Sequence, residues 1–126
     1  MQSSITLNYT FLHALKRGYK KMIQMLINYA LENNIILDMF QKNNGNYPLL
    51  VAIKRTGANI IRKIFNYAKT NNILLEINEK NNQGDYPLLC TIRENDMEMI
   101  QLLTDYAKDN KTALINDEII NNNNKI

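Results

Sequence analysis

The chain repeats itself at intervals of 38 to 39 residues, and this periodicity restricts its possible folds more than any other feature. Residues 45–53 (GNYPLLVAI) return 39 residues later as residues 84–92 (GDYPLLCTI). A more divergent copy lies 38 residues earlier, where Tyr9, Leu12 and Ala14 take the places of Tyr47, Leu50 and Ala52. A period in this range is typical of repeat architectures. The sequence therefore predicts three copies of one structural unit, at about residues 6–42, 43–80 and 81–118.

Each of the last two copies opens with a turn and a short helix. Gly45 and Gly84 follow asparagine-rich stretches where the chain must turn sharply, and glycine enters left-handed backbone geometry without steric cost. Three residues further on, Pro48 and Pro87 suit the first position of a helix, where a missing N–H costs nothing. The pattern predicts helices over roughly 48–55 and 87–94.

A second, amphipathic helix is expected in every unit, because apolar residues recur there at helical spacing. These residues are Met22, Ile23, Leu26, Ile27 and Ala30, then Ile60, Ile61, Ile64, Phe65 and Ala68, and finally Met99, Ile100, Leu103 and Ala107. Alternating apolar residues follow, at 35, 37 and 39 and at 73, 75 and 77, and indicate short extended connectors. A helix pair with one apolar side must be covered by a neighbour, so the prediction is an all-α solenoid.

These units resemble the ankyrin repeat, in which a glycine turn precedes Thr-Pro-Leu-His and the second helix has the pattern Ile-Val-x-x-Leu-Leu. Residues 45–52 (GNYPLLVA) and 99–103 (MIQLL) match that frame, and the resemblance covers roughly residues 6–116. Tyr47 and Tyr86 replace the family's threonine, while Leu50 and Leu89 replace its histidine, so the polar link between those two residues cannot form. In the first unit Thr10 replaces the proline.

The resemblance implies a non-enzymatic module that binds another protein. In ankyrin-like stacks the turn tips and the exposed side of the first helices form a concave binding surface. The corresponding candidates are Asn46 and Asp85 at the tips, and His13, Lys16, Arg17, Val51, Lys54, Arg55, Cys90, Arg93 and Glu94 on the helices. The alternative is a structural spacer within a longer repeat array, which would stack with further repeats or with itself.

No pattern in the sequence predicts catalysis, a cofactor or a metal site. Catalytic and metal sites need converging groups, yet the chain has one histidine, His13, and one cysteine, Cys90. His13 is expected to be a partly exposed helix residue and Cys90 to serve packing. The turn glycines are single, so no phosphate-binding loop is indicated.

The charge of +3 is distributed unevenly along the chain. Residues 1–42 carry +3, residues 43–80 carry +4 and residues 81–126 carry −4. Such polarity can steer a charged partner or favour head-to-tail stacking, although solubility is the commoner reason for surface charge.

Nucleic-acid binding is the least favoured alternative. Tyr29, Tyr67 and Tyr106 could form an aromatic ladder beside the basic residues of the first two units. They occupy equivalent repeat positions, however, so packing between units explains them more simply. The acidic third unit would also interrupt a basic track.

The sequence predicts a soluble protein inside the cell, in the cytoplasm or alternatively the nucleus. No stretch approaches the roughly 18 to 20 apolar residues of a membrane helix, and residues 1–4 (MQSS) do not resemble a signal peptide. Residues 119–126 are polar and are expected to form a mobile tail.

Overall fold

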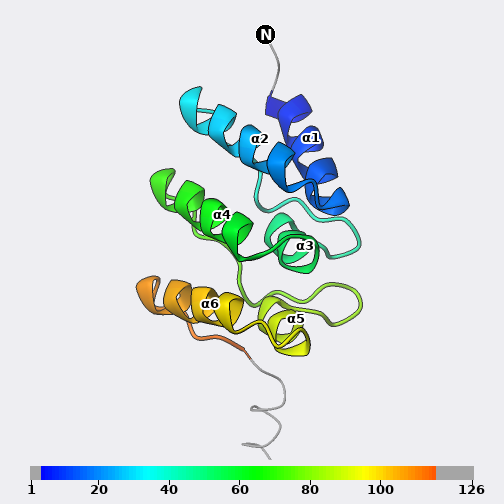
Figure 1. The fold of residues 1–126 in the computed structure, drawn as a ribbon, viewed down its shortest axis with the longest axis vertical. Helices are drawn as coiled ribbons and strands as arrows, with labels where there is room; N and C mark the ends of the chain where they lie inside the picture. Colours follow the sequence, from blue (N-terminus) through cyan, green and yellow to red (C-terminus); the bar gives the residue numbers. More distant parts are fainter. Residues whose placement is uncertain (1–3, 116–126) are drawn as a thin grey trace, which may run out of the picture.

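Six α-helices make up the part of the chain that the computed structural model describes, residues 4–115 (Figure 1). They are α1 Ser4–Arg17, α2 Lys20–Glu32, α3 Pro48–Arg55, α4 Ala58–Thr70, α5 Pro87–Arg93 and α6 Met97–Asp109. No β-strand occurs within these residues, where Asn43 and Asn46 form an isolated antiparallel bridge. The all-α prediction is therefore confirmed for residues 4–115.

The helices form three pairs that lie one above another. Within the pairs α1 packs on α2, α3 on α4 and α5 on α6; between pairs, α1, α3 and α5 form one row and α2, α4 and α6 a second (Figure 1). Neither α1 nor α2 contacts α5 or α6. Each pair therefore packs only against its immediate neighbours in the stack. We call residues 4–42, 43–80 and 81–115 units 1, 2 and 3.

The first helices of units 2 and 3 begin as the sequence predicts. Pro48 and Pro87 are the first residues of α3 and α5, after tyrosines with extended backbones that make no side-chain cap. Instead of capping the helix, the Tyr47 hydroxyl donates to the C=O of Glu79 at 2.8 Å. The tyrosine thus links the start of its helix to the connector at the end of unit 2.

Every second helix ends in the same way. The residues at the C-caps are Asn33, Asn71 and Asn110, and the Nδ2 of each donates to the C=O four residues earlier at 2.8 to 3.0 Å. The next residue in each unit has a φ between 53° and 55°. Asparagine tolerates this left-handed geometry better than most residues, and it fills the position in units 1 and 2. The repeated Asn-Asn pair therefore stops the helix and starts the connector.

The connectors are neither helix nor strand, but their side chains alternate in burial as predicted. Leu37, Met39, Leu75 and Ile77 are buried, whereas Ile36 is exposed. The buried residues join one hydrophobic core that runs through all three units. Burial of apolar surface along the whole stack is the main favourable term in its stability.

The sequence also predicts a mobile polar tail and the absence of a membrane-spanning helix. The polar tail at 119–126 lies outside the described residues, as do residues 116–118 of the third repeat. Among the six described helices, none has both the length and the apolar character needed to cross a membrane.

Candidate protein-binding surface

The C-terminal ends of the first helices bring together most of the predicted binding residues. Lys16, Lys54 and Arg93 occupy equivalent positions on α1, α3 and α5, and Arg17, Arg55 and Glu94 occupy the next ones. The five cations lie in last turns, where the helix dipole stabilises positive charge. Because α3 contacts both α1 and α5, these ends are neighbours in the stack.

Three of the cations are available to a partner. Lys16, Arg17 and Arg55 are exposed, and none of them forms an ion pair with another residue of the described chain. His13, one turn before Arg17 on α1, is also exposed. These side chains can therefore contact a second molecule without first breaking an ion pair within the chain.

The prediction that Val51 and Cys90 are exposed on their helices is wrong. Each is only 7% exposed, and both belong to the hydrophobic core. Both residues occupy the repeat position of His13, which is exposed. Unlike histidine, however, both are apolar and pack inward, so equivalent positions in the repeat differ in exposure. The other expectation for Cys90, a packing role, agrees with its place in the core, and burial also raises the pKa of its thiol.

The turn tips of units 2 and 3 pack against each other. The N–H of Asn82 donates to the C=O of Asn44 at 3.2 Å, and Asn81 Nδ2 donates to Asn46 Oδ1 at 2.9 Å. Asn81 Oδ1 in turn accepts from the backbone N–H groups of Gln83 and Asp85, at 2.9 Å each. The side chain of Asn46, a predicted binding residue, therefore accepts a hydrogen bond that joins the two tips. The buried Asn81, which the sequence did not single out, organises the whole turn.

Asp85 joins the tip of unit 3 to two first helices. Its Oδ2 accepts from Lys54 Nζ and its Oδ1 from Arg93 Nη1, both at 2.8 Å. The hydrogen bond from Lys54, then that from Arg93, lowers the pKa of the Asp85 carboxyl. The structure thus brings together three of the predicted residues, but in a contact that they satisfy among themselves.

Replacing Asp85 with asparagine should lower the free energy of unfolding by about 1 kcal/mol near neutral pH, because two charge-assisted hydrogen bonds are weakened. A carboxyl whose pKa is lowered by folding stabilises the fold above its ordinary pKa, 3.8, and loses that contribution as the pH falls through the lowered value. The difference from the native chain should therefore shrink when unfolding is measured well below pH 3.8. Urea unfolding at both pH values measures it, with Glu94→Gln as the neutral control.

The tyrosines near the ends of α4 and α6 connect neighbouring units. The Tyr67 hydroxyl donates to the C=O of Ile35 at 2.5 Å and accepts from the N–H of Leu37 at 2.8 Å. The Tyr106 hydroxyl accepts from the N–H of Leu75 at 2.9 Å. Because Tyr67 is fully buried, it cannot stack on a nucleic-acid base. The simpler interpretation, packing between units, describes both tyrosines.

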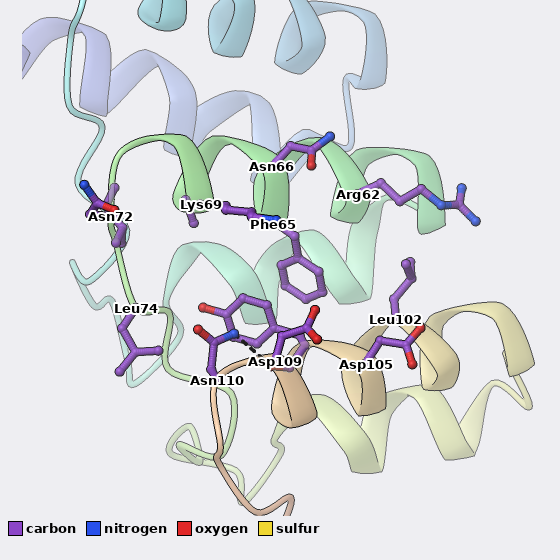
Figure 2. A pocket seen from close by; sticks show the side chains of 13 residues that line it. Arg62, Phe65, Asn66, Lys69, Asn72, Leu74, Leu102, Asp105, Asp109 and Asn110 are labelled. Atoms are coloured by element: carbon purple, nitrogen blue, oxygen red, sulfur yellow. Dashed lines mark hydrogen bonds between the residues drawn. The ribbon is translucent and has the colours of Figure 1, made fainter.

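A groove of about 800 Å³ lies between α4 and α6, and none of the predicted binding residues lines it (Figure 2). Within it the Phe65 and Tyr106 rings stack, with centroids 4.5 Å apart and planes 25° apart. Lysine and arginine line its α4 side and aspartates its α6 side. Since the charges are balanced and the stacked rings occupy the middle, the groove is best described as part of the contact between units 2 and 3. The sequence shows Phe65 only as one more apolar residue.

The surface formed by the first helices is therefore the best-supported candidate. It presents exposed cations from two adjacent helices, beside a carboxylate that two further cations hold in place. Comparison of the chain with protein-family models, with curated proteins and with solved structures finds no match to any of them.

Proposed function

We propose that the chain is a non-enzymatic protein-binding module, an ankyrin-like solenoid that binds its partner through the first helices. The observation that carries this proposal is the matched placement of Lys16, Arg17 and Arg55. These exposed cations lie at the ends of adjacent helices, with no ion-pair partner within residues 4–115. A binding surface built on packed helices is positioned before the partner arrives, which lowers the entropic cost of association.

The ankyrin-like interpretation is supported by the local structure of units 2 and 3. Their turn glycines have φ of 78° and 82°, and α3 and α5 begin at the expected prolines. The helices pair and stack as such units require. The missing threonine–histidine link has a substitute in unit 2, where the Tyr47 hydroxyl bonds to the connector and Leu50 is buried.

The charge on this surface favours a partner with acidic side chains. Units 1 and 2 present Lys16, Arg17 and Arg55 without ion-pair partners, whereas in unit 3 Arg93 is paired with Asp85 and the next position is Glu94. Opposite charges across an interface increase the association rate and select against partners with the wrong charge. A surface that changes sign suits a protein segment with localised carboxylates better than the continuous phosphates of a nucleic acid.

Charge reversal at Arg17 and Arg55 tests the proposal. The double variant Arg17→Glu/Arg55→Glu should weaken partner binding about tenfold or more, because attraction becomes repulsion. These positions are better choices than Lys54, whose reversal would also place two carboxylates side by side. The assay is affinity purification with mass spectrometry from the native cell, followed by binding measurements with the recovered protein.

The matched control is Lys21→Glu/Lys63→Glu, which makes the same change in charge on α2 and α4 at two lysines that form no ion pair within residues 4–115. The control should retain the partner, and all three proteins should give the same helical circular dichroism. Equal binding by both double variants would exclude the first-helix surface. Turnover of a substrate, or recovery of nucleic acid without protein, would contradict the proposed function itself.

A further inference from the structure

The two ends of the helical stack differ from its interior at equivalent repeat positions. In the interior, a second-helix tyrosine always reaches the preceding connector, as Tyr67 and Tyr106 do. Tyr29 occupies the same position in α2, but α1 and α2 form one end of the stack (Figure 1). Tyr29 is 43% exposed, whereas Tyr67 is fully buried.

Other residues beside Tyr29 show the same contrast. Met22 is 46% exposed, although Ile60 and Met99, its counterparts in units 2 and 3, are 1% and 3% exposed. Met25, one turn further along α2, is also exposed. Met22, Met25 and Tyr29 are thus three large apolar side chains exposed on one helix, and such a grouping is typical of an interaction surface. We call Met22, Met25 and Tyr29 the unit-1 end face.

Unit 3 carries the complementary surface at the opposite end. Ile92 is exposed on α5, while its counterparts Leu15 and Ile53 are buried by the next unit. Ile100 and Leu114 are likewise more exposed than their counterparts in units 1 and 2. We call Ile92, Ile100 and the segment 112–114 the unit-3 end face.

The segment 112–114 has the backbone arrangement that receives a tyrosine elsewhere in the chain. The N–H of Thr112 donates to the C=O of Ala107 at 2.9 Å, as the equivalent residues Ile35 and Ile73 donate to Ala30 and Ala68 at 2.9 and 2.8 Å. Within residues 4–115, the C=O of Thr112 and the N–H of Leu114 make no hydrogen bond. These two groups correspond to the C=O of Ile35 and the N–H of Leu37, which Tyr67 bonds in the connector at the end of unit 1.

Charge favours contact between these two ends. Unit 1 carries a net charge of +3 over residues 1–42, and the described part of unit 3 carries six acidic and three basic side chains. Opposite fields at the ends of a molecule steer copies into head-to-tail orientation. Lys69 and Asp109 line the same groove between units 2 and 3. If unit 3 of one copy met unit 1 of a second copy in the same way, the equivalent residues Lys108 and Glu32 would approach each other.

We propose that the unit-1 end face of one molecule binds the unit-3 end face of a second copy, so that chains stack head to tail. The contact repeats the interface between units: Tyr29 bonds to the backbone of Thr112 and Leu114 of the other copy, and its apolar neighbours are buried. A second copy is the occupant because this chain itself carries the surface that covers these positions within the stack. Such a heterologous contact leaves both outer ends open, so it can extend beyond a dimer.

Sedimentation velocity of the purified chain tests this stacking directly. Over a roughly hundredfold range of concentration, the weight-average sedimentation coefficient should rise steadily as dimers and longer stacks form. Met25→Glu and Ile92→Glu each place a charge in one end face at a position that is already exposed. Each should weaken self-association about tenfold or more. Ile36→Glu, on a connector and intermediate in exposure between Met25 and Ile92, should leave self-association unchanged.

Mixing the two variants distinguishes head-to-tail stacking from any symmetric dimer. The Met25→Glu chain keeps its unit-3 end face and the Ile92→Glu chain keeps its unit-1 end face, so the mixture should form a one-to-one dimer that does not grow longer. A native chain that stays monomeric over the whole range contradicts the proposal. So does an Ile92→Glu chain that self-associates as well as the native chain, since the contact would then not use the unit-3 end face.

Discussion

Alanine at position 45 is expected to lower the free energy of unfolding by about 3 kcal/mol, one of the largest effects of a single added methyl group in this chain. Gly45 has a φ of 78°, where a side chain is strained. Its Cβ would also lie 2.8 Å from the Cα of Asn81 and from the N of Asn82. Both atoms belong to the backbone, so the tips of units 2 and 3 would have to separate.

Gly84→Ala is the matched control for the contribution of φ alone. Gly84 has a φ of 82°, but an added Cβ would meet no atom within 4 Å. Only the left-handed conformation is penalised there, at about 1 kcal/mol. Urea unfolding followed by far-ultraviolet circular dichroism measures both variants. Equal losses at the two positions would show that the tips do not pack together.

Tyr67→Phe is expected to cost about 2 kcal/mol, although it removes a single oxygen atom. The hydroxyl donates to the C=O of Ile35 and accepts from the N–H of Leu37, which is buried. Phenylalanine would leave both groups without their partner. Burial also raises the pKa of Tyr67, so the hydroxyl keeps the proton that it donates throughout the neutral range.

Tyr29→Phe provides the comparison at the equivalent position of unit 1. Its side chain is exposed, and its hydroxyl makes no hydrogen bond within residues 4–115. The variant should unfold with the native chain's free energy when both are studied at low protein concentration. Thermal or urea unfolding of the two tyrosine variants side by side measures the difference. A loss of stability as large as that of Tyr67→Phe would contradict the assigned contact.

The local structure of the units could be predicted because it depends on neighbouring residues in sequence. The expected helix over 48–55 matches α3, and the one over 87–94 matches α5 with its C-cap, Glu94. Proline at the first helical position and glycine at the turn act through their own backbone restrictions. Helical spacing also identified residues that are buried, such as Ile61 and Ile64.

Contacts between units could not be predicted in the same way. The pairing of Lys54 with Asp85 joins residues 31 positions apart, and the stack of Phe65 on Tyr106 joins residues on different helices. Nothing near either residue in the sequence identifies its partner. The same limitation explains Val51, whose burial depends on how its helix is packed and not on its place in the repeat.

The abundance of asparagine illustrates a second limitation. A compositional bias alone would account for 21 asparagines in 126 residues. The structure nevertheless gives several of them defined roles. Asn33, Asn71 and Asn110 bond back to their helices, and Asn81 holds the turn of unit 3. A residue type that is common throughout the chain does not reveal which copies are structurally required.

Amide hydrogen exchange tests most directly whether the tyrosine contacts join the units into one stack. If they do, the N–H groups of Leu37 and Leu75 are bonded to tyrosine hydroxyls and should exchange slowly, while those of Ile36 and Leu74 in the same connectors exchange rapidly. At low protein concentration Leu114 should exchange rapidly as well. Rapid exchange at both Leu37 and Leu75 would mean that the helical pairs are not held together as described.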